Sequence, residues 1–151
     1  MAKKATSKDA ELILKLYELR QEPELRKARN WFLVTFWPET AEEYEQVERS
    51  FGSQENNWLR QAMGYWNMAA ALVLHGTLDH DLFLEPACSG EMFFCFAKMA
   101  PILEEVRAKT QNPQMLANIE KVIKSSKAGR ERLAVLEKRV AARKAAMKTA
   151  E

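Results

Sequence analysis

The sequence has little of what a β-rich, disulfide-bonded or membrane-spanning protein needs. Glycine and proline occur five times each in 151 residues, which is few for strands joined by tight turns. The two cysteines, Cys88 and Cys95, are too few for a disulfide framework, and we expect both to be free thiols in a reducing cytoplasm. The longest apolar stretch, from Trp66 to Leu74, is about half a membrane span. We therefore expect no transmembrane helix.

The sequence also lacks the common catalytic and nucleotide-binding motifs. It has no P-loop, no dinucleotide-binding glycine pattern and no Gly-x-Ser-x-Gly elbow. One cluster has metal-ligand chemistry, and it consists of His75, Asp79, His80 and Asp81, with Glu85 nearby. Its spacing fits no common zinc or iron site, and Gly76 is expected to end a helix between the histidines. The sequence therefore predicts a protein that is not an enzyme and holds no metal or cofactor. A metal-dependent enzyme is the least favoured alternative.

What the sequence does contain is a set of helical segments. Apolar residues make up 47% of the chain, which suffices for one domain with a packed core. They recur at helical spacing between cap and turn signals. The pattern predicts an all-α fold, an irregular bundle of six to eight helices. The expected helical segments run from about Ser7 to Arg20, Pro23 to before Pro38, Thr40 to Gly52, Gln54 to His75, Thr77 to Phe83, Ser89 to Val106, Asn112 to Ile123, and Arg130 almost to the end.

The segment from Gln54 to His75 is predicted to lie at the centre of the bundle. Two adjacent apolar stripes run along it, one of them through Trp58, Trp66 and Val73. A helix with apolar residues over most of its circumference contacts neighbours on most sides. We therefore expect Trp66 to be buried.

Three local features of the sequence carry separate expectations. The run from Trp31 to Trp37 is apolar nearly all round and reads alone as a buried strand, but no other segment offers a strand to pair with it. Thr40 and Glu43 have the spacing of a capping box. Pro101 lies inside an apolar helical stripe and is expected to kink or split that helix.

Charge is unevenly distributed, although the net charge is only +2. Ten basic and two acidic residues lie between Lys121 and Ala150, which leaves 13 basic and 19 acidic residues for the rest. We predict a helical bundle domain over residues 1–128 and a long basic helix over 129–151 that extends the same domain. Because the apolar seam of this helix is narrow, we expect it to be partly detached, with its charge available to a partner. Its candidate interaction residues are Arg130, Arg132, Lys138, Arg139, Arg143 and Lys144.

Two aromatic residues add to the candidate interaction surface. Trp37 and Phe94 fall off the main apolar stripes, and we expect them to be exposed interface residues. The sequence thus favours a non-enzymatic helical interaction module that binds a protein partner or self-associates through the C-terminal helix. The alternative is a nucleic-acid-binding accessory protein that uses the basic C-terminal helix.

Part of the chain is similar to an uncharacterised family of bacterial all-helical proteins of unknown function. The similarity rests on the stretches 64–73 and 76–83, with the signals at 101–105 and 112–113 in the expected order after them. It covers about residues 10–125. The resemblance implies an all-α fold in a bacterial cytoplasm, and it implies no particular activity.

Overall fold

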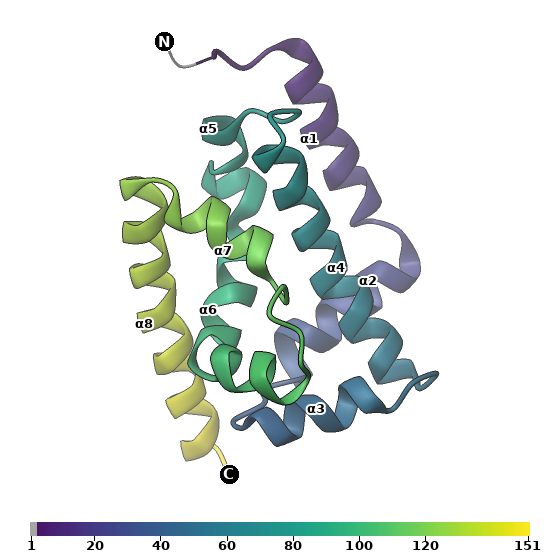
Figure 1. Ribbon diagram of the computed structural model, residues 1–151. Coiled ribbons are helices and arrows are strands. Elements are labelled where there is room, and N and C mark those ends of the chain that lie inside the picture. The colour runs from purple at the N-terminus through teal and green to yellow at the C-terminus, as the bar shows by residue number, and fades with distance from the viewer. Residues whose placement is uncertain (1–2) are drawn as a thin grey trace.

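The structure, a computed structural model, describes residues 3–151. Over these residues it is all-α, with eight α-helices and one π-helical turn (Figure 1), which confirms the predicted bundle of six to eight helices. The apolar run after Asn30 is helical and not a strand. None of the described helices is long and apolar enough to cross a bilayer. The elements are α1 (Ser7–Leu19), α2 (Pro23–Asn30), η1 (the π-helical turn Trp31–Thr35), α3 (Ala41–Arg49), α4 (Gln54–Leu74), α5 (His80–Phe83), α6 (Pro86–Lys109), α7 (Ala117–Lys124) and α8 (Lys127–Thr149).

Side-chain caps begin several of these helices. The predicted capping box at α3 is half formed: Thr40 accepts a hydrogen bond from the Glu43 N–H, but the Glu43 carboxylate accepts from the N–H of Glu39 instead of returning to Thr40. A complete box stands at α1. There Thr6 Oγ1 accepts from the Asp9 N–H, and Asp9 Oδ2 accepts from the Thr6 N–H at 2.7 Å.

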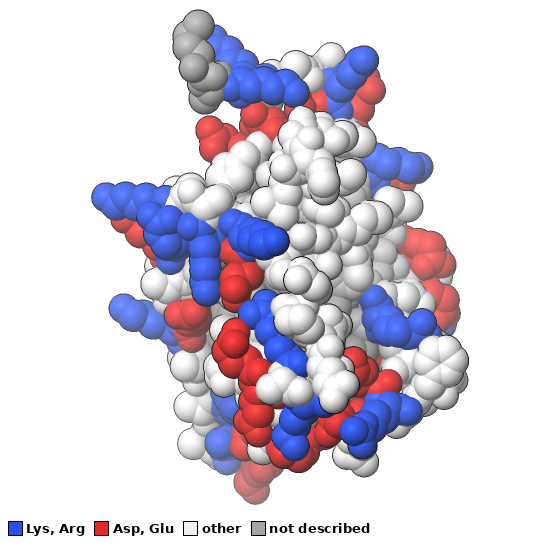
Figure 2. Space-filling model, viewed as in Figure 1, with Lys and Arg blue, Asp and Glu red and all other residues white. Residues whose placement is uncertain are grey.

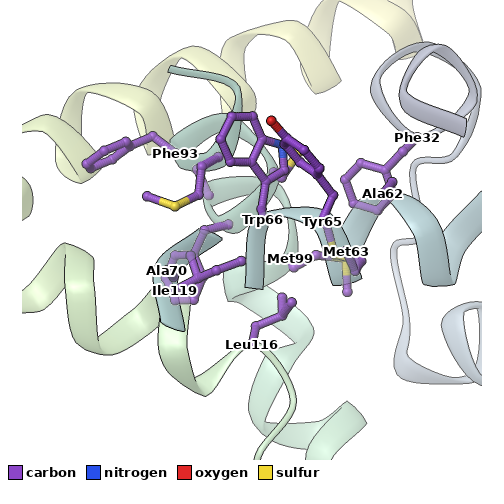
Figure 3. Packing of buried hydrophobic residues seen from close by; sticks show 14 of the residues in the cluster. Phe32, Ala62, Met63, Tyr65, Trp66, Ala70, Phe93, Met99, Leu116 and Ile119 are labelled. Atoms are coloured by element: carbon purple, nitrogen blue, oxygen red, sulfur yellow. The ribbon is translucent and has the colours of Figure 1, made fainter. Parts of the chain in front are cut away.

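Helix α4 is the centre of the bundle, as predicted, and packs against α2 and α7. Its Trp66 is only 1% exposed. Figure 3 shows Trp66 in one cluster with Phe93 and Met99 of α6 and Ile119 of α7. The Trp66 ring also meets the ring of Tyr65 edge to face, with centroids 4.8 Å apart. The core therefore depends on a helix that touches neighbours on most of its sides.

A half-buried ion pair holds three helices together around this core. Arg29 of α2 forms a forked contact with Glu91 of α6, with Nη2 to Oε2 at 2.5 Å and Nε to Oε1 at 2.9 Å. The indole N–H of Trp66 donates to the same carboxylate at 3.2 Å. Charged hydrogen bonds of this kind are strong and directional. One carboxylate thus fixes α2, α4 and α6 relative to one another.

The break predicted at Pro101 lies elsewhere in α6. Helix α6 runs through Pro101 to Lys109, and the one residue with non-helical dihedral angles inside it is Ser89, at φ −130° and ψ 15°. The helix begins with Pro86, earlier than the predicted Ser89 cap, because a proline fits the first helical turn, where its missing N–H has no partner to lose. Ser89 therefore marks a kink after the first turn and not the start of the helix.

Helix α7 begins later than the proline signal predicted. Residues 111–116 form turns, and Leu116 takes a left-handed conformation with φ of 54° directly before the helix. Arg107 donates to the Met115 carbonyl from Nε at 3.0 Å and from Nη2 at 2.8 Å, which holds this turn against α6. The helix therefore starts at Ala117, after Asn112 and Pro113.

Helix α8 is docked on the body, and the expectation that it is partly detached is wrong. It lies beside α6 and α7 (Figure 1) and packs against them. Its Leu133 and Val140 are buried. Gly129 allows this close approach, because a Cβ there would lie 2.1 Å from the Ile123 carbonyl oxygen. Polar contacts that the apolar seam does not reveal add to the docking: Lys148 pairs with Glu39 of the chain before α3 at 3.0 Å.

Leu133→Ala tests this docking. We expect the substitution to lower the free energy of unfolding by about 2–3 kcal/mol, since it removes a buried side chain between α8 and the body. Val135→Ala on the exposed side of the same helix is the matched control and is expected to change stability by less than about 0.5 kcal/mol. Equal and small effects in urea denaturation would mean that α8 is free of the body.

Candidate interaction surfaces

Trp37 and Phe94 lie together, but they are not exposed as the sequence pattern predicted. Both are half-buried, and their rings meet edge to face with centroids 5.9 Å apart. The Trp37 indole N–H donates to the Val34 carbonyl at 3.1 Å. Each aromatic ring covers part of the other, so the pair forms a wall between η1 and α6 and does not project into solvent.

Several basic residues of α8 are engaged by the body. The Arg132 guanidinium lies over the Phe93 ring, 4.2 Å from its centroid, and donates to the Leu84 carbonyl. Arg130 Nη1 donates to the Lys124 carbonyl at 2.7 Å at the end of α7. A cation held over a ring and against a carbonyl stabilises the docked helix. These two arginines therefore have a structural role in the fold.

The remaining candidate residues of α8 are less committed. Lys138, Arg139 and Arg143 are exposed and Lys144 is half-buried, and no ion pair to a carboxylate occurs for them within residues 3–151. In the view of Figure 2, basic side chains alternate with acidic and uncharged ones along the edge where α8 lies. The outer side of α8 also carries the exposed Val135. A continuous basic face is not visible there.

The structure does not bring the histidines into a metal site. His80 Nε2 lies 2.9 Å from Ser125 Oγ, and its Nδ1 lies 3.1 Å from Asp81. Asp79 uses its carboxylate to cap α5 by accepting from the Leu82 N–H. His75 is exposed at the end of α4. Among the described residues, no group of three or more histidine, cysteine, aspartate and glutamate side chains has an arrangement that could hold a metal ion.

Helix α1 is held to the body by one buried side and by two polar contacts. Leu16 is buried, and its carbonyl accepts a hydrogen bond from the Tyr65 hydroxyl. Asp9 Oδ1 accepts from the Asp79 N–H at 2.8 Å. Hydrogen bonds to the Asp9 carboxylate, first from the Thr6 hydroxyl, hold its pKa below the ordinary value. The opposite side of α1 is left free of such contacts.

The free side of α1 carries an apolar ridge beside an apolar groove. Leu14 is 67% exposed and Tyr17 is 55% exposed, and we call these two side chains the α1 ridge. The same two side chains form one wall of a groove of about 310 Å³ between α1 and the first turn of α6. Its other lining residues are Ile13, Leu16, Arg20, Ala87 and Cys88, and we call it the α1 groove. Exposed leucine and tyrosine bordering a concave apolar surface are typical of a protein-binding site.

One cation lies at the α1 groove. Arg20 lines it, with its guanidinium carbon 5.1 Å from the Tyr17 ring centroid and 5.3 Å from that of Trp66. Stacking covers the flat faces of a guanidinium and leaves its N–H groups at the edge. The groove itself is mostly apolar, and exposed Glu11 and Glu18 flank Leu14 on the same side of α1.

A second concave surface lies on the other side of the bundle, between α6 and α8. This pocket of about 400 Å³ has walls from three segments, the chain after η1, α6 and α8. Its lining residues are Trp37, Pro38, Ala97, Lys98, Ala100, Pro101, Glu137, Val140, Ala141 and Lys144. Lys98 lines it and is only 5% exposed. We call it the Lys98 pocket. Its size and its apolar walls are those of a small-molecule site.

The Lys98 ammonium has an unusual surrounding for a lysine. Nζ donates to the Phe32 carbonyl, in the last turn before η1 ends, and lies 4.3 Å from the ring centroids of both Phe32 and Trp37. A cation at a helix C-terminus satisfies a carbonyl that lacks an intrahelical donor. Burial away from water lowers the pKa of Lys98 to about 7. Lys98 therefore caps η1 and titrates near neutrality.

Lys98 and Asp9 were not predicted as functional or capping residues. Both lie in segments that were predicted to be helical from their apolar residues alone. Lys98 sits between Phe96 and Met99, two residues of the stripe predicted to be buried. That position was the available signal, since a lysine inside a buried stripe needs a partner or a lowered pKa. Asp9 comes three residues after Thr6, which is the spacing of a capping box.

The comparisons with known proteins give a family and no function. Neither the curated proteins nor the solved structures include a match to this chain. One family model matches residues 5–126, which is most of the chain and agrees with the similarity to an uncharacterised family. The match ends at residue 126, two residues after α7 ends at Lys124 and one residue before α8 begins at Lys127. The chain belongs to the family described as "domain of unknown function (DUF4760)".

Proposed function

We propose that this protein is a non-enzymatic helical interaction module that self-associates through α1. The observation that carries the proposal is the α1 ridge, which projects from one wall of the mostly apolar α1 groove. Exposed apolar side chains of this size at a concave apolar surface favour a protein partner. We infer that this partner is a second copy of the chain.

The arrangement of ridge and groove supports a two-fold contact. In an isologous dimer the same patch meets itself, so each copy must offer both a projecting and a receiving element. The α1 ridge projects Leu14 from one wall of the α1 groove, and we expect the groove of each copy to receive Leu14 of the other. Exposed Glu11 and Glu18 lie three residues before and four residues after Leu14, and Lys15 pairs with Glu18 at 3.4 Å, so the rim of the patch is charged. The apolar part of the patch can therefore face its own copy, with these charged residues around it.

The length of α1 sets the strength of the contact. A helix of 13 residues is about 20 Å long, and a contact along it buries less than the roughly 800 Å² per partner of a standard stable interface. We therefore expect a weak, reversible dimer with a dissociation constant of about 0.1 mM.

Leu14→Glu is expected to abolish this dimer. A carboxylate in place of Leu14 is opposed by its own copy across the two-fold axis and cannot enter an apolar groove without a cost of several kcal/mol. The measurement is sedimentation equilibrium up to about 1 mM protein. Because Leu14 is exposed in the single chain, the free energy of unfolding at low concentration stays within about 0.5 kcal/mol of the parent.

Phe51→Glu is the matched control. Phe51 is 82% exposed, at the turn between α3 and α4, and lies outside the α1 groove. The variant should dimerise like the parent. A parent chain that stays monomeric at millimolar concentration, or a Leu14→Glu chain that dimerises as well as Phe51→Glu, removes the support for self-association through α1.

Nucleic-acid binding through α8 is the alternative proposal, and it has less support. Lys138, Arg139 and Arg143 are free to meet phosphate, whereas Arg130 and Arg132 are engaged by the body. We also propose that the protein is bacterial and cytoplasmic. The resemblance to bacterial helical proteins supports the first, and two free thiols fit a reducing compartment.

A further inference from the structure

The Lys98 pocket has the features of a ligand site that is distinct from the α1 face. It lies between α6 and α8, and Figure 1 shows α8 and α1 on opposite sides of the bundle. Its volume of about 400 Å³ is within the range of small-molecule pockets. The walls are mostly apolar: Trp37 and Pro38 on one side, Val140 on the other, with the Lys98 amine between them.

The cation in this pocket lacks an anionic partner. The Phe32 carbonyl is the acceptor found for Lys98 Nζ within residues 3–151, which leaves two of its three N–H bonds without one. The charged neighbours that act on it are Arg143, also a cation, and Cys95, whose buried thiol has a raised pKa and stays neutral. A buried ammonium with no counter-charge is costly to the fold. An anion that enters the pocket supplies the missing counter-charge for the Lys98 ammonium.

We propose that the Lys98 pocket binds a small amphiphilic carboxylate, with its head group at Lys98 Nζ and its apolar body against Trp37, Pro38 and Val140. Two α8 side chains at the pocket, Lys144 and Glu137, bear opposite charges that offset each other. The charge of the ligand is therefore set by the Lys98 ammonium, which favours an anion. The apolar walls select against a bare phosphate or a nucleic-acid backbone, because those ligands bring no apolar surface to bury.

Binding is linked to protonation of Lys98. The free amine titrates near pH 7, and a bound carboxylate favours the ammonium form, so its pKa rises in the complex. At about pH 7 each binding event therefore takes up about half a proton. Above that pH the proton must be supplied before the ion pair forms. We expect binding to be about twentyfold weaker at pH 8.5 than at pH 6.5. The other groups at the pocket are Glu137, Lys144, Arg143 and Cys95, and a Lys98 variant separates their contribution.

Decanoate is the probe, and decylamine is its matched counterpart with the opposite charge on the same chain. The measurement is titration calorimetry on the full chain, below the concentration at which decanoate forms micelles, with Trp37 fluorescence as a second signal. We expect decanoate to bind one site and decylamine not to bind. Lys98→Met keeps the length of the side chain and removes the charge, and it is expected to weaken decanoate binding by at least about tenfold. Lys138→Met, on the outside of α8, is the control and should bind like the parent.

Several results overturn the proposal. Equal binding of decanoate and decylamine contradicts it, because that result means an apolar surface without charge recognition. Binding of decanoate that is the same in Lys98→Met, or that is absent from the parent, contradicts it as well. If Lys98→Met fails to fold, the pH dependence and the decanoate-to-decylamine comparison on the parent chain still decide. None of these results depends on the dimer, because Leu14→Glu leaves the pocket intact and can carry the same titrations.

Discussion

Trp66→Ala is expected to lower the free energy of unfolding by roughly 3–5 kcal/mol. The side chain is almost fully buried in the central helix, where it packs with side chains of α6 and α7. Its indole N–H also donates to Glu91, the carboxylate that holds Arg29. Truncation therefore leaves a cavity and removes one hydrogen bond from a half-buried charged group, and both losses destabilise the fold.

Phe51→Ala is the control for this experiment, since it truncates an aromatic side chain that is exposed. Its effect should stay within about 0.5 kcal/mol. Urea denaturation followed by circular dichroism measures both variants. If Trp66→Ala is as stable as Phe51→Ala, α4 is not the centre of the core.

Lys98→Met is expected to change how stability depends on pH. An unfolded lysine keeps its proton up to a pKa of about 10.4, whereas folded Lys98 loses it at about pH 7. Between these values the unfolded state binds more protons, so the free energy of unfolding of the parent rises with pH. A single group with this shift contributes about 1.5 kcal/mol between pH 7 and pH 8.5. The variant has no such group, and its curve should be flat by comparison.

The same substitution is expected to stabilise the protein at lower pH. At about pH 6 the parent holds a desolvated ammonium, and an apolar side chain of equal length avoids that cost by roughly 2–4 kcal/mol. Loss of the hydrogen bond to the Phe32 carbonyl offsets about 1 kcal/mol of this gain in stability. Cys88, whose thiol pKa is raised, titrates in both proteins, so its effect cancels in the difference. A variant that is less stable than the parent at every pH, with the slope retained, would show that Lys98 is not the titrating group.

Most of the fold follows from apolar periodicity and cap residues. The stripes around Trp66 place α4 at the centre, and capping threonines and serines mark where several helices start. Helix ends near proline were less predictable. A proline is tolerated in the first turn and also within a long, well-packed helix, so Pro86 begins α6 and Pro101 does not end it.

The candidate sites depend on tertiary contacts that local patterns do not contain. The docking of α8 requires the close approach at Gly129 and the Arg132 contact with Phe93, and neither is visible in the apolar seam of that helix. Lys98 is buried in a pocket whose walls include Trp37 and residues of α8. Leu14 and Tyr17 read as parts of an amphipathic helix, and only the packing of α1 decides which of its apolar residues stay exposed.

Self-association through α1 is tested most directly by recording ¹H–¹⁵N NMR spectra of the parent chain at about 0.05 mM and about 1 mM, concentrations on either side of the expected dissociation constant. We predict concentration-dependent shifts of the amides in residues 10–20 of α1 and at Ala87 and Cys88 of α6, with unchanged signals along α8. Spectra that superimpose at both concentrations, or shifts confined to α8, would contradict the assignment of the α1 face as the interface.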